Sequence, residues 1–160
     1  MPVTVDDERY MRHALDACRH GVERGQAPFG ACIVRAGEVL ATAHNQVWAN
    51  TDPTAHAEVQ AIRQAARALG ELLLEGATIY STTEPCPMCF TAIHWARIGR
   101  IVYGAAIADA ARFGFNELAV SNRTLKREGG LTVAIDGGVL AADSVALFEL
   151  WSQSSGARSY

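Results

Sequence analysis

Two short stretches organise this sequence, His56-Ala57-Glu58 and Glu84-Pro85-Cys86-Pro87-Met88-Cys89. Each lies where a loop or strand is expected to turn into a helix. Together they offer one imidazole and two thiolates, one ligand short of the four that close a structural zinc site. A fourth position would then be open to a water, and Glu58 is the acid/base group that such a water needs. The pattern therefore indicates a catalytic zinc site, with the ligands His56, Cys86 and Cys89.

The expected positions of these ligands suit zinc binding. Cys86 and Cys89 fall in the first turn of an expected helix, where unpaired N–H groups and the helix dipole favour negative charge. Thiolates are stabilised there, and zinc binds the thiolate form. Residues two apart do not share a face within a helix. His56 and Glu58 can therefore converge on one metal only at an irregular helix entry.

Two other interpretations of the cysteines are open. A redox Cys-x-x-Cys pair does not come with a His-x-Glu motif at an upstream helix start. A structural zinc module needs a fourth protein ligand, for which His44 and His94 are the candidates. Such a module predicts metal-dependent folding and no turnover. An enzyme predicts that Glu58→Ala abolishes catalysis without unfolding the chain.

Composition limits the class of protein. The 160 residues predict one domain over residues 1–160, with residues 152–160 as a polar C-terminal tail. The net charge of -3 argues against a nucleic-acid partner, because binding to the phosphate backbone requires clustered Lys and Arg. We expect no secretory signal, no membrane span and reduced cysteines, and hence a cytoplasmic protein. Cys18 and Cys32 are expected to be core residues.

Periodicity predicts a three-layer α/β/α fold with a mixed five-stranded sheet. The first two strands should form an antiparallel hairpin around the turn Arg35-Ala36-Gly37-Glu38, and the remaining strands should be parallel. About 26 residues separate the last two strands, enough for a helical crossover. The predicted strands are 29–34, 39–43, 77–82, 100–104 and 131–135, and the predicted helices are 7–24, 52–69, 85–97 and one around 145–151.

Three local expectations accompany this fold. Asp52 or Thr54 should cap the second helix, with Pro53 in its first turn. The inward face of that helix should carry Val59, Ile62, Ala66 and Leu69. Residues 109–115 should belong to the last crossover, and the polar segment 121–130 should be a surface excursion.

The segments Asp52–Ile62 and Thr83–Ile107 resemble the cytidine-deaminase-like superfamily, in its branch of guanine and tRNA adenosine deaminases. The H-x-E…P-C-x-x-C pattern is the signature of zinc-dependent nucleobase deaminases. Within the branch, Arg97–Ala105 is similar to the tRNA enzymes, which typically have a small residue at the position of Trp95. The free-base guanine deaminases are favoured by Pro28-Phe29-Gly30, Asn45, Asp52-Pro53-Thr54-Ala55-His56, Ile93-His94-Trp95-Ala96-Arg97 and Asp109-Ala110-Ala111 through Gly114-Phe115.

This resemblance implies a zinc enzyme that converts guanine and water to xanthine and ammonia. The substrate contacts that it implies are Phe29, Asn45, Trp95 and a carboxylate after Gly114-Phe115, here Glu117. One common family pattern has two aspartates there, whereas this chain has Asn116-Glu117. The alternatives are deamination of ammeline, isocytosine or cytosine, or of adenosine in tRNA.

The end of the chain carries a further prediction. Some guanine deaminases exchange C-terminal segments between subunits and end in a tyrosine, as this chain does at Tyr160. The resemblance thus implies a homodimer in which the tail closes the active site, with Tyr160 as the lid residue. An aromatic ring can stack on a base while its hydroxyl stays in water.

Overall fold

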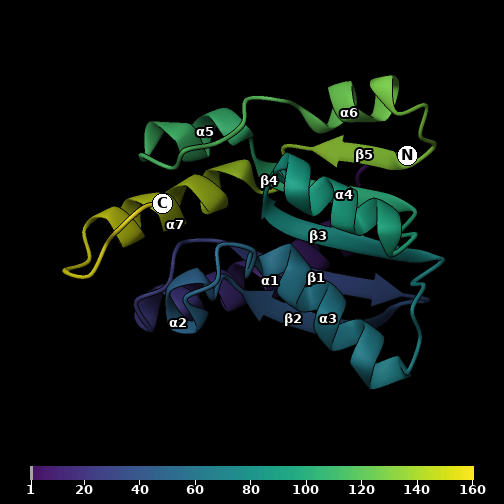
Figure 1. The fold of residues 1–160 in the computed structure, drawn as a ribbon, viewed down its shortest axis with the longest axis horizontal. Coiled ribbons are helices and arrows are strands. Elements are labelled where there is room, and N and C mark those ends of the chain that lie inside the picture. Colours follow the sequence, from purple (N-terminus) through teal and green to yellow (C-terminus); the bar gives the residue numbers. More distant parts are fainter. Residues whose placement is uncertain (1) are drawn as a thin grey trace.

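The structure is a computed structural model, and it describes residues 2–160. Helices and strands alternate along most of the chain (Figure 1). The helices are α1 Val5–Glu23, α2 Val47–Asn50, α3 Ala57–Leu69, α4 Pro87–Trp95, α5 Ile107–Arg112, α6 Asn122–Glu128 and α7 Ala141–Ser152. The strands are β1 Gly30–Arg35, β2 Glu38–His44, β3 Ala77–Thr83, β4 Arg100–Ala105 and β5 Ala134–Gly137. No helix within residues 2–160 is long and apolar enough to cross a membrane.

The five strands form one mixed sheet in the order β2-β1-β3-β4-β5. β1 is antiparallel to both of its neighbours, while β3, β4 and β5 run parallel. The predicted hairpin is confirmed, with positive φ angles at Ala36 and Gly37 in its two-residue turn. The predicted parallel pairing of the last two strands is confirmed too. β5 lies later than predicted, because pairing begins only where Ala134 meets Arg100 at the start of β4.

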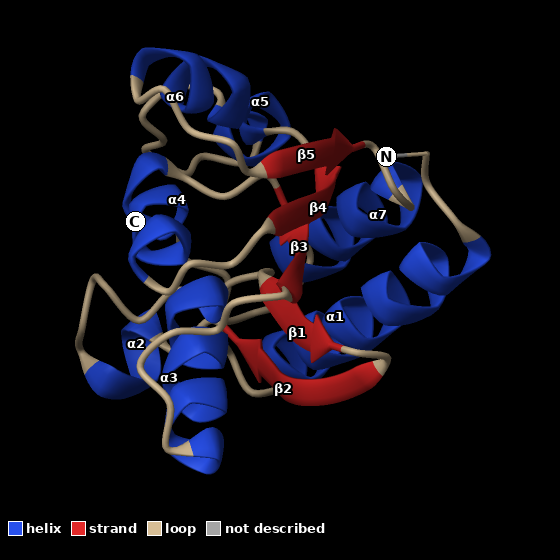
Figure 2. Cartoon of the chain, turned by 90° about the vertical axis from the view of Figure 1, so that its right-hand side faces the viewer, coloured by secondary structure: helices blue, strands red, loops and turns tan. Residues whose placement is uncertain are grey.

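Helices cover both faces of the sheet (Figure 2). α1 and α7 pack on one face, in a core that includes Met11, Cys18, Cys32 and Phe148. The burial predicted for Cys18 and Cys32 is therefore confirmed. α3 and α4 pack on the other face, and α6 lies beside α4. The three-layer prediction is correct.

The start of α3 differs from the prediction. Neither Asp52 nor Thr54 caps this helix, because the backbone N–H and the hydroxyl of Thr54 both donate to Asp52 Oδ1, at 2.8 and 2.7 Å, closing a local turn. The helix begins at Ala57, and His56 is its N-cap. The turn competes with the helix for the Asp52 side chain, and His56 takes the N-cap position without a capping hydrogen bond from its side chain.

The buried face of α3 also differs from the prediction. Its buried residues are Ala57, Glu58, Ala61 and Ala65. Val59, Ile62, Ala66 and Leu69, which were predicted to point inward, are partly buried, and of these Ile62 and Leu69 do pack against the core on this face of the sheet. The small residues face the sheet because the helix packs closely against β1 and β2.

Two segments for which no helix was predicted contain one. Residues 47–50 form the short helix α2, and the segment after Ser121 forms α6. Ser121 caps α6 by accepting a hydrogen bond of 3.1 Å from the Thr124 N–H. The polar composition of 121–130 reflects a helix at the edge of the fold rather than an irregular excursion.

A buried ion-pair network joins α1 to the amino end of β4. The Arg100 guanidinium contacts Asp7 Oδ1 at 2.6 Å and Asp136 Oδ2 at 2.8 Å. The Tyr80 hydroxyl also donates to Asp7 Oδ1, at 2.8 Å. Since β3 and β4 are parallel, this network lies at the opposite end of the sheet from the loop that carries Cys86 and Cys89.

Candidate active site

His56 and Cys86 occupy equivalent positions in two helices. Each is the N-cap of its helix, with extended φ and ψ of -67° and 155° for His56 and of -64° and 166° for Cys86. Pro87 at the first position of α4 fits that helix start, because its fixed φ is helical and its missing N–H is not needed there. Cys89 follows in the first turn. The irregular helix entry that the sequence required for His56 is present.

The three candidate ligands converge. His56 Nδ1 lies 3.6 Å from Cys86 Sγ and 3.5 Å from Cys89 Sγ. A tetrahedral zinc ion with ordinary Zn–S and Zn–N bonds holds nitrogen and sulfur about 3.5 Å apart. All three ligand atoms lie within 4.8 Å of one another, and no other such cluster of His, Cys, Asp or Glu occurs within residues 2–160. The donor set and its spacing fit zinc.

The ionisation of the ligands also suits a cation. A hydrogen bond from Cys89 lowers the pKa of Cys86 to about 4, against the effect of burial, and His56 adds to the lowering. That same bond and burial raise the pKa of Cys89. Burial alone would lower the pKa of His56, but Cys86 and Glu58 raise it. The site therefore favours negative charge on Cys86, and a bound metal ion would favour the thiolate form of both cysteines.

Glu58 lies beside this cluster in the second position of α3 and is 6% exposed. Burial raises the pKa of its carboxyl group, and negative charge on Cys86 adds to the rise. The Ser81 hydroxyl lies 3.0 Å from Glu58 Oε1 and 2.7 Å from the carbonyl oxygen of Thr83. A buried carboxylate of this kind is a suitable general base and acid.

A small hollow adjoins the cluster, and we call it the active-site hollow. Its volume of about 10 Å³ corresponds to the room for one water. Its lining comprises Phe29, His56, Glu58, Thr83, Glu84, Cys86 and Glu117. Phe29 and Glu117, two of the residues predicted to contact substrate, thus line this hollow, and their contacts with substrate stay predictions. Burial raises the pKa of Glu117 to about 7, and the nearby negative charges contribute to that rise.

Asn45 and Tyr160 meet next to this hollow. Asn45 is fully buried, and its side-chain amide donates a hydrogen bond of 2.6 Å to the Tyr160 hydroxyl. The Tyr160 ring lies 5.7 Å from the His56 ring and 5.4 Å from the Phe115 ring. The tail therefore folds back over the metal ligands of its own chain.

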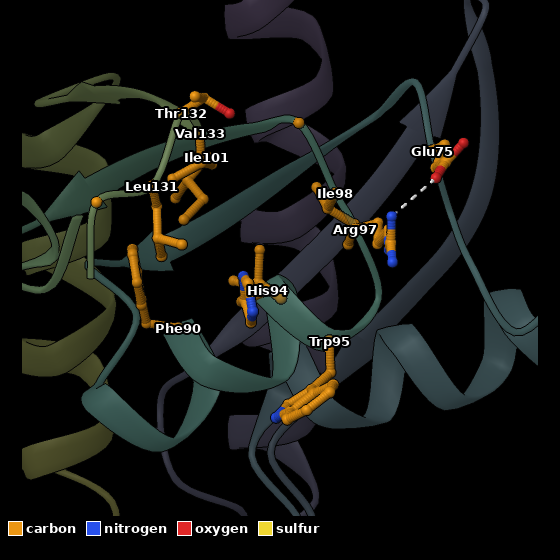
Figure 3. A pocket seen from close by; sticks show the side chains of 13 residues that line it. Glu75, Phe90, His94, Trp95, Arg97, Ile98, Ile101, Leu131, Thr132 and Val133 are labelled. Atoms are coloured by element: carbon orange, nitrogen blue, oxygen red, sulfur yellow. Dashed lines mark ion pairs between the residues drawn. The ribbon is translucent and has the colours of Figure 1, made fainter.

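Trp95 does not join this group of residues within one chain. Its side chain is 74% exposed at the end of α4, and its ring contacts the His94 ring at 5.7 Å. It lines a separate and larger hollow of about 570 Å³ (Figure 3). This outer hollow also includes Phe90, Leu131 and Val133. The substrate contact predicted for Trp95 stays a prediction.

Sequence reasoning missed several residues around the site. Ser81 contacts Glu58, and its signal was a polar side chain on the same face of a buried strand as Ala77 and Ile79. Trp48 had no assigned role, yet its indole N–H donates to the Arg158 carbonyl at 3.1 Å. The Arg158 guanidinium lies 3.9 Å above the same ring. No local pattern links residues so far apart in the chain.

Glu84 is another residue that sequence reasoning missed, and its hydrogen bonds stabilise the loop that presents Cys86. Its carboxylate accepts a hydrogen bond of 2.8 Å from the Asn122 N–H at the start of α6. It also accepts one of 3.4 Å from the Ile107 N–H at the start of α5. Both helices are thereby tied to the loop that presents Cys86.

Comparison with known families agrees with this geometry. Residues 4–105 match the family model of the cytidine and deoxycytidylate deaminase zinc-binding region. The chain belongs to this family. It is a zinc-dependent hydrolytic deaminase, and the structural zinc module is not supported, since neither His44 nor His94 joins the metal cluster.

Relatives of two substrate classes are similar to the chain. It is 43% identical to the guanine deaminase of Bacillus subtilis over 114 residues, 71% of this chain and 73% of that protein. It is 44% identical to the tRNA-specific adenosine deaminase of the same organism over 99 residues, 62% of each protein. The corresponding enzyme of Agrobacterium fabrum is 47% identical over 110 residues, 65% of this chain and 72% of that protein.

Solved structures of both classes of deaminase are also similar to this chain. A structure from a study of tRNA:A34 deaminases superposes with a TM-score of 0.76 at 35% identity, covering 87% of this chain and 98% of that one. The Bacillus subtilis guanine deaminase superposes with a TM-score of 0.67 at 44% identity, covering 69% and 71%. The guanine deaminase of Nitrosomonas europaea, at 23% identity, shares the fold with a TM-score of 0.86 over 96% and 88%.

Proposed function

We propose that this deaminase acts on a free nucleobase, with guanine as its preferred substrate and xanthine and ammonia as products. One observation carries the proposal: the Glu117 carboxyl group lines the active-site hollow together with Glu58 and His56. A bound zinc ion nearby would favour the ionised form of Glu117.

A carboxylate in this position suits a ring that offers N–H donors. Guanine presents the N1–H and the exocyclic amine side by side, whereas the ring nitrogens of adenine that take part in its pairing are acceptors. An analogue that lacks the donors would leave a desolvated charge unpaired, which costs much of the binding energy. In our proposal Glu117 accepts hydrogen bonds from the N1–H and the exocyclic amine of guanine, while Asn45 hydrogen-bonds another polar edge of the ring.

Glu58 carries out the proton transfers. Bound zinc lowers the pKa of a water toward neutrality. Glu58 takes the proton released as the water adds to the amino-bearing carbon, and it returns protons to the ring nitrogen and to the departing amine. The balance is guanine plus water to xanthine plus ammonia. Ser81 holds Glu58 Oε1 at 3.0 Å during this exchange.

The tail encloses the substrate in this proposal. Phe29 offers a ring face in the hollow, and its own ring is held edge-on by Phe115 at 4.9 Å and Phe148 at 5.5 Å. A hollow of about 10 Å³ cannot hold a purine, so the site must open for substrate to enter. In our proposal the part that moves is the Tyr160 ring, which lies 5.7 Å from the His56 ring. A free base can be covered in this way, whereas a base within a long RNA needs an open side.

We further propose a homodimer in the cytoplasm. Trp95 is an exposed aromatic residue beside a hollow with a mixed polar and apolar lining, and exposed apolar side chains next to polar ones are typical of contact surfaces. A second chain at this face could bring Trp95 toward a ring held by Phe29. The tail contacts of Tyr160 are made within one chain in this structure, and exchanged tails would make the same contacts between chains.

Adenosine in tRNA is the second candidate substrate. The observation in its favour is the identity of 44 to 47% to two tRNA-specific adenosine deaminases. The net charge of -3 and the closed tail argue against a large polyanion at this site.

An ammonia-release panel separates the candidates. The substrates are guanine, guanosine, ammeline, isocytosine, cytosine, adenine and a tRNA anticodon stem. We expect guanine to have the highest kcat/KM of the panel. Turnover of a pyrimidine, a triazine or the tRNA stem with guanine untouched would overturn the substrate assignment.

A further inference from the structure

Thr83 lines the active-site hollow, and its Oγ1 is a buried polar atom without a hydrogen-bond partner. Thr83 is 3% exposed, and its hydroxyl is one of three buried side-chain polar atoms that lack a partner in the described part of the chain. The other two belong to Asn122 and Ser144, which do not line this hollow. Buried polar groups are nearly always paired, so a buried hydroxyl left free at a site calls for an explanation.

The backbone places Thr83 beside the reacting groups. It is the last residue of β3, paired with Ala105 of β4, and it lies three residues before Cys86. Ser81, two residues earlier, faces the same side of the sheet and contacts both Glu58 Oε1 and the Thr83 carbonyl oxygen. Thr83 thus stands between the carboxyl group that moves protons and the loop that carries two metal ligands.

We propose that Thr83 Oγ1 hydrogen-bonds the amidine group of the substrate ring and is a specificity-determining residue. A hydroxyl can both donate and accept, so it can pair with a ring nitrogen or with the amine next to it. The carbonyl oxygen of the same residue accepts a hydrogen bond of 2.7 Å from Ser81, whereas the hydroxyl has no protein partner and can pair with a ligand. This inference rests on deamination at the active-site hollow and deepens the proposed function.

The size of the hollow is consistent with this role. At about 10 Å³ it holds one water, which can pair with the hydroxyl when no substrate is bound. Substrate that displaces this water must replace its hydrogen bond or lose affinity. Thr83 would therefore favour rings that carry a polar atom next to the reacting carbon.

Two variants of Thr83 test the proposal. Thr83→Val keeps the branched shape and removes the hydroxyl, and Thr83→Ser keeps the hydroxyl. We expect Thr83→Val to lose about tenfold in kcat/KM on the best ring of the ammonia-release panel, and Thr83→Ser to stay within about threefold of wild type. Zinc content should be unchanged in both, and the Tm of Thr83→Val should not fall, because no protein hydrogen bond is lost.

Thr82→Val is the matched control. Thr82 is the neighbouring residue, and its Oγ1 accepts a hydrogen bond of 3.0 Å from the Gly30 N–H. This variant should lower the Tm and leave kcat/KM nearly unchanged, the reverse of the result expected at Thr83.

The outcomes separate the two proposals. Thr83→Val with wild-type kcat/KM, or with a lowered Tm, overturns the role of Thr83 while the substrate assignment stands. If guanine is not deaminated while another ring is, the substrate assignment is overturned. The Thr83 variants are then compared with wild type on that other ring. A zinc-loaded enzyme that releases ammonia from nothing in the panel overturns both.

Discussion

The hydroxyl of Tyr160, the last residue, accepts a hydrogen bond of 2.6 Å from the side-chain amide of Asn45, which lies 115 positions earlier. A second bond joins the Tyr160 carbonyl to the Asn116 N–H at 3.0 Å. Asn116 is next to Glu117, and Asn45 follows the end of β2. The end of the chain is thus tied to two segments that line or border the active site.

Removing Ser154–Tyr160 should open the active-site hollow. We expect turnover to fall severalfold or more, because the ring of Tyr160 and its hydrogen bond to Asn45 are lost. Zinc content should be unchanged, since the three ligands lie elsewhere. The Tm should fall only slightly, because just Ala157 and Tyr160 of the deleted segment contact the core and both are partly exposed. Steady-state kinetics and elemental analysis test this, and kinetics equal to wild type would rule out the lid.

Arg158 and Trp48 should hold the tail closed. A guanidinium over an exposed indole contributes about 0.5–1 kcal/mol, so Arg158→Ala should shift the population of closed tails about two- to fivefold. We expect a matching fall in kcat/KM and faster amide exchange in residues 153–160. Arg158→Lys, which keeps the charge, should retain part of the effect. Identical amide-exchange rates in wild type and Arg158→Ala would show that Arg158 does not hold the tail closed.

Zinc binding and proton transfer should separate by mutation. Cys86→Ala should lose most of the bound zinc and all activity, because two ligands remain. Glu58→Gln should keep near-unit zinc and the wild-type Tm while turnover falls by about 10²–10⁴. Elemental analysis beside ammonia release measures both. Activity in a preparation of the protein that contains no metal would contradict the proposed mechanism.

Glu117→Gln should alter substrate choice rather than folding. Loss of the charge facing the guanine N–H and amine edge should lower kcat/KM for guanine by about tenfold or more. Zinc content and Tm should stay close to wild type, because Glu117 is partly exposed and donates no ligand. Equal kinetics of Glu117→Gln and wild type on guanine would show that the carboxylate is a solvated charge.

Asp7 should stabilise the fold in a pH-dependent way. Burial alone would raise the pKa of this carboxyl group, but hydrogen bonds from Arg100, the Thr4 N–H and Tyr80 outweigh it and hold the pKa well below its usual range. A pKa that is lower in the folded state gives stability that is present above the unfolded value of about 3.9 and lost as the pH falls below it.

Asp7→Asn should therefore lower the free energy of unfolding at pH 7 by about 3 kcal/mol, because Arg100 keeps only part of its buried partners. The difference from wild type should shrink between about pH 4 and pH 2. Urea denaturation at both ends of that range measures this. Asp6→Asn is the control, since the Asp6–Arg9 pair is exposed and should contribute little. A loss that stays the same at low pH would contradict the assignment.

Local chemistry in the sequence was sufficient for the metal site and for the order of the five strands and the four longest helices. His56, Glu58, Cys86 and Cys89 could be assigned because ligand type, spacing and helix starts are local properties. The hairpin around Ala36-Gly37 and the crossover before β5 follow in the same way from turn residues and chain length.

The tertiary structure decided what those local patterns leave open. It places Tyr160 on Asn45, Arg158 on Trp48 and Ser81 on Glu58, and it leaves Trp95 exposed and the hydroxyl of Thr83 without a partner. Contacts between residues distant in sequence depend on how the helices pack on the sheet and where the tail returns. Periodicity records which face of an element is apolar, but it carries no information about which residue of another element lies opposite that face.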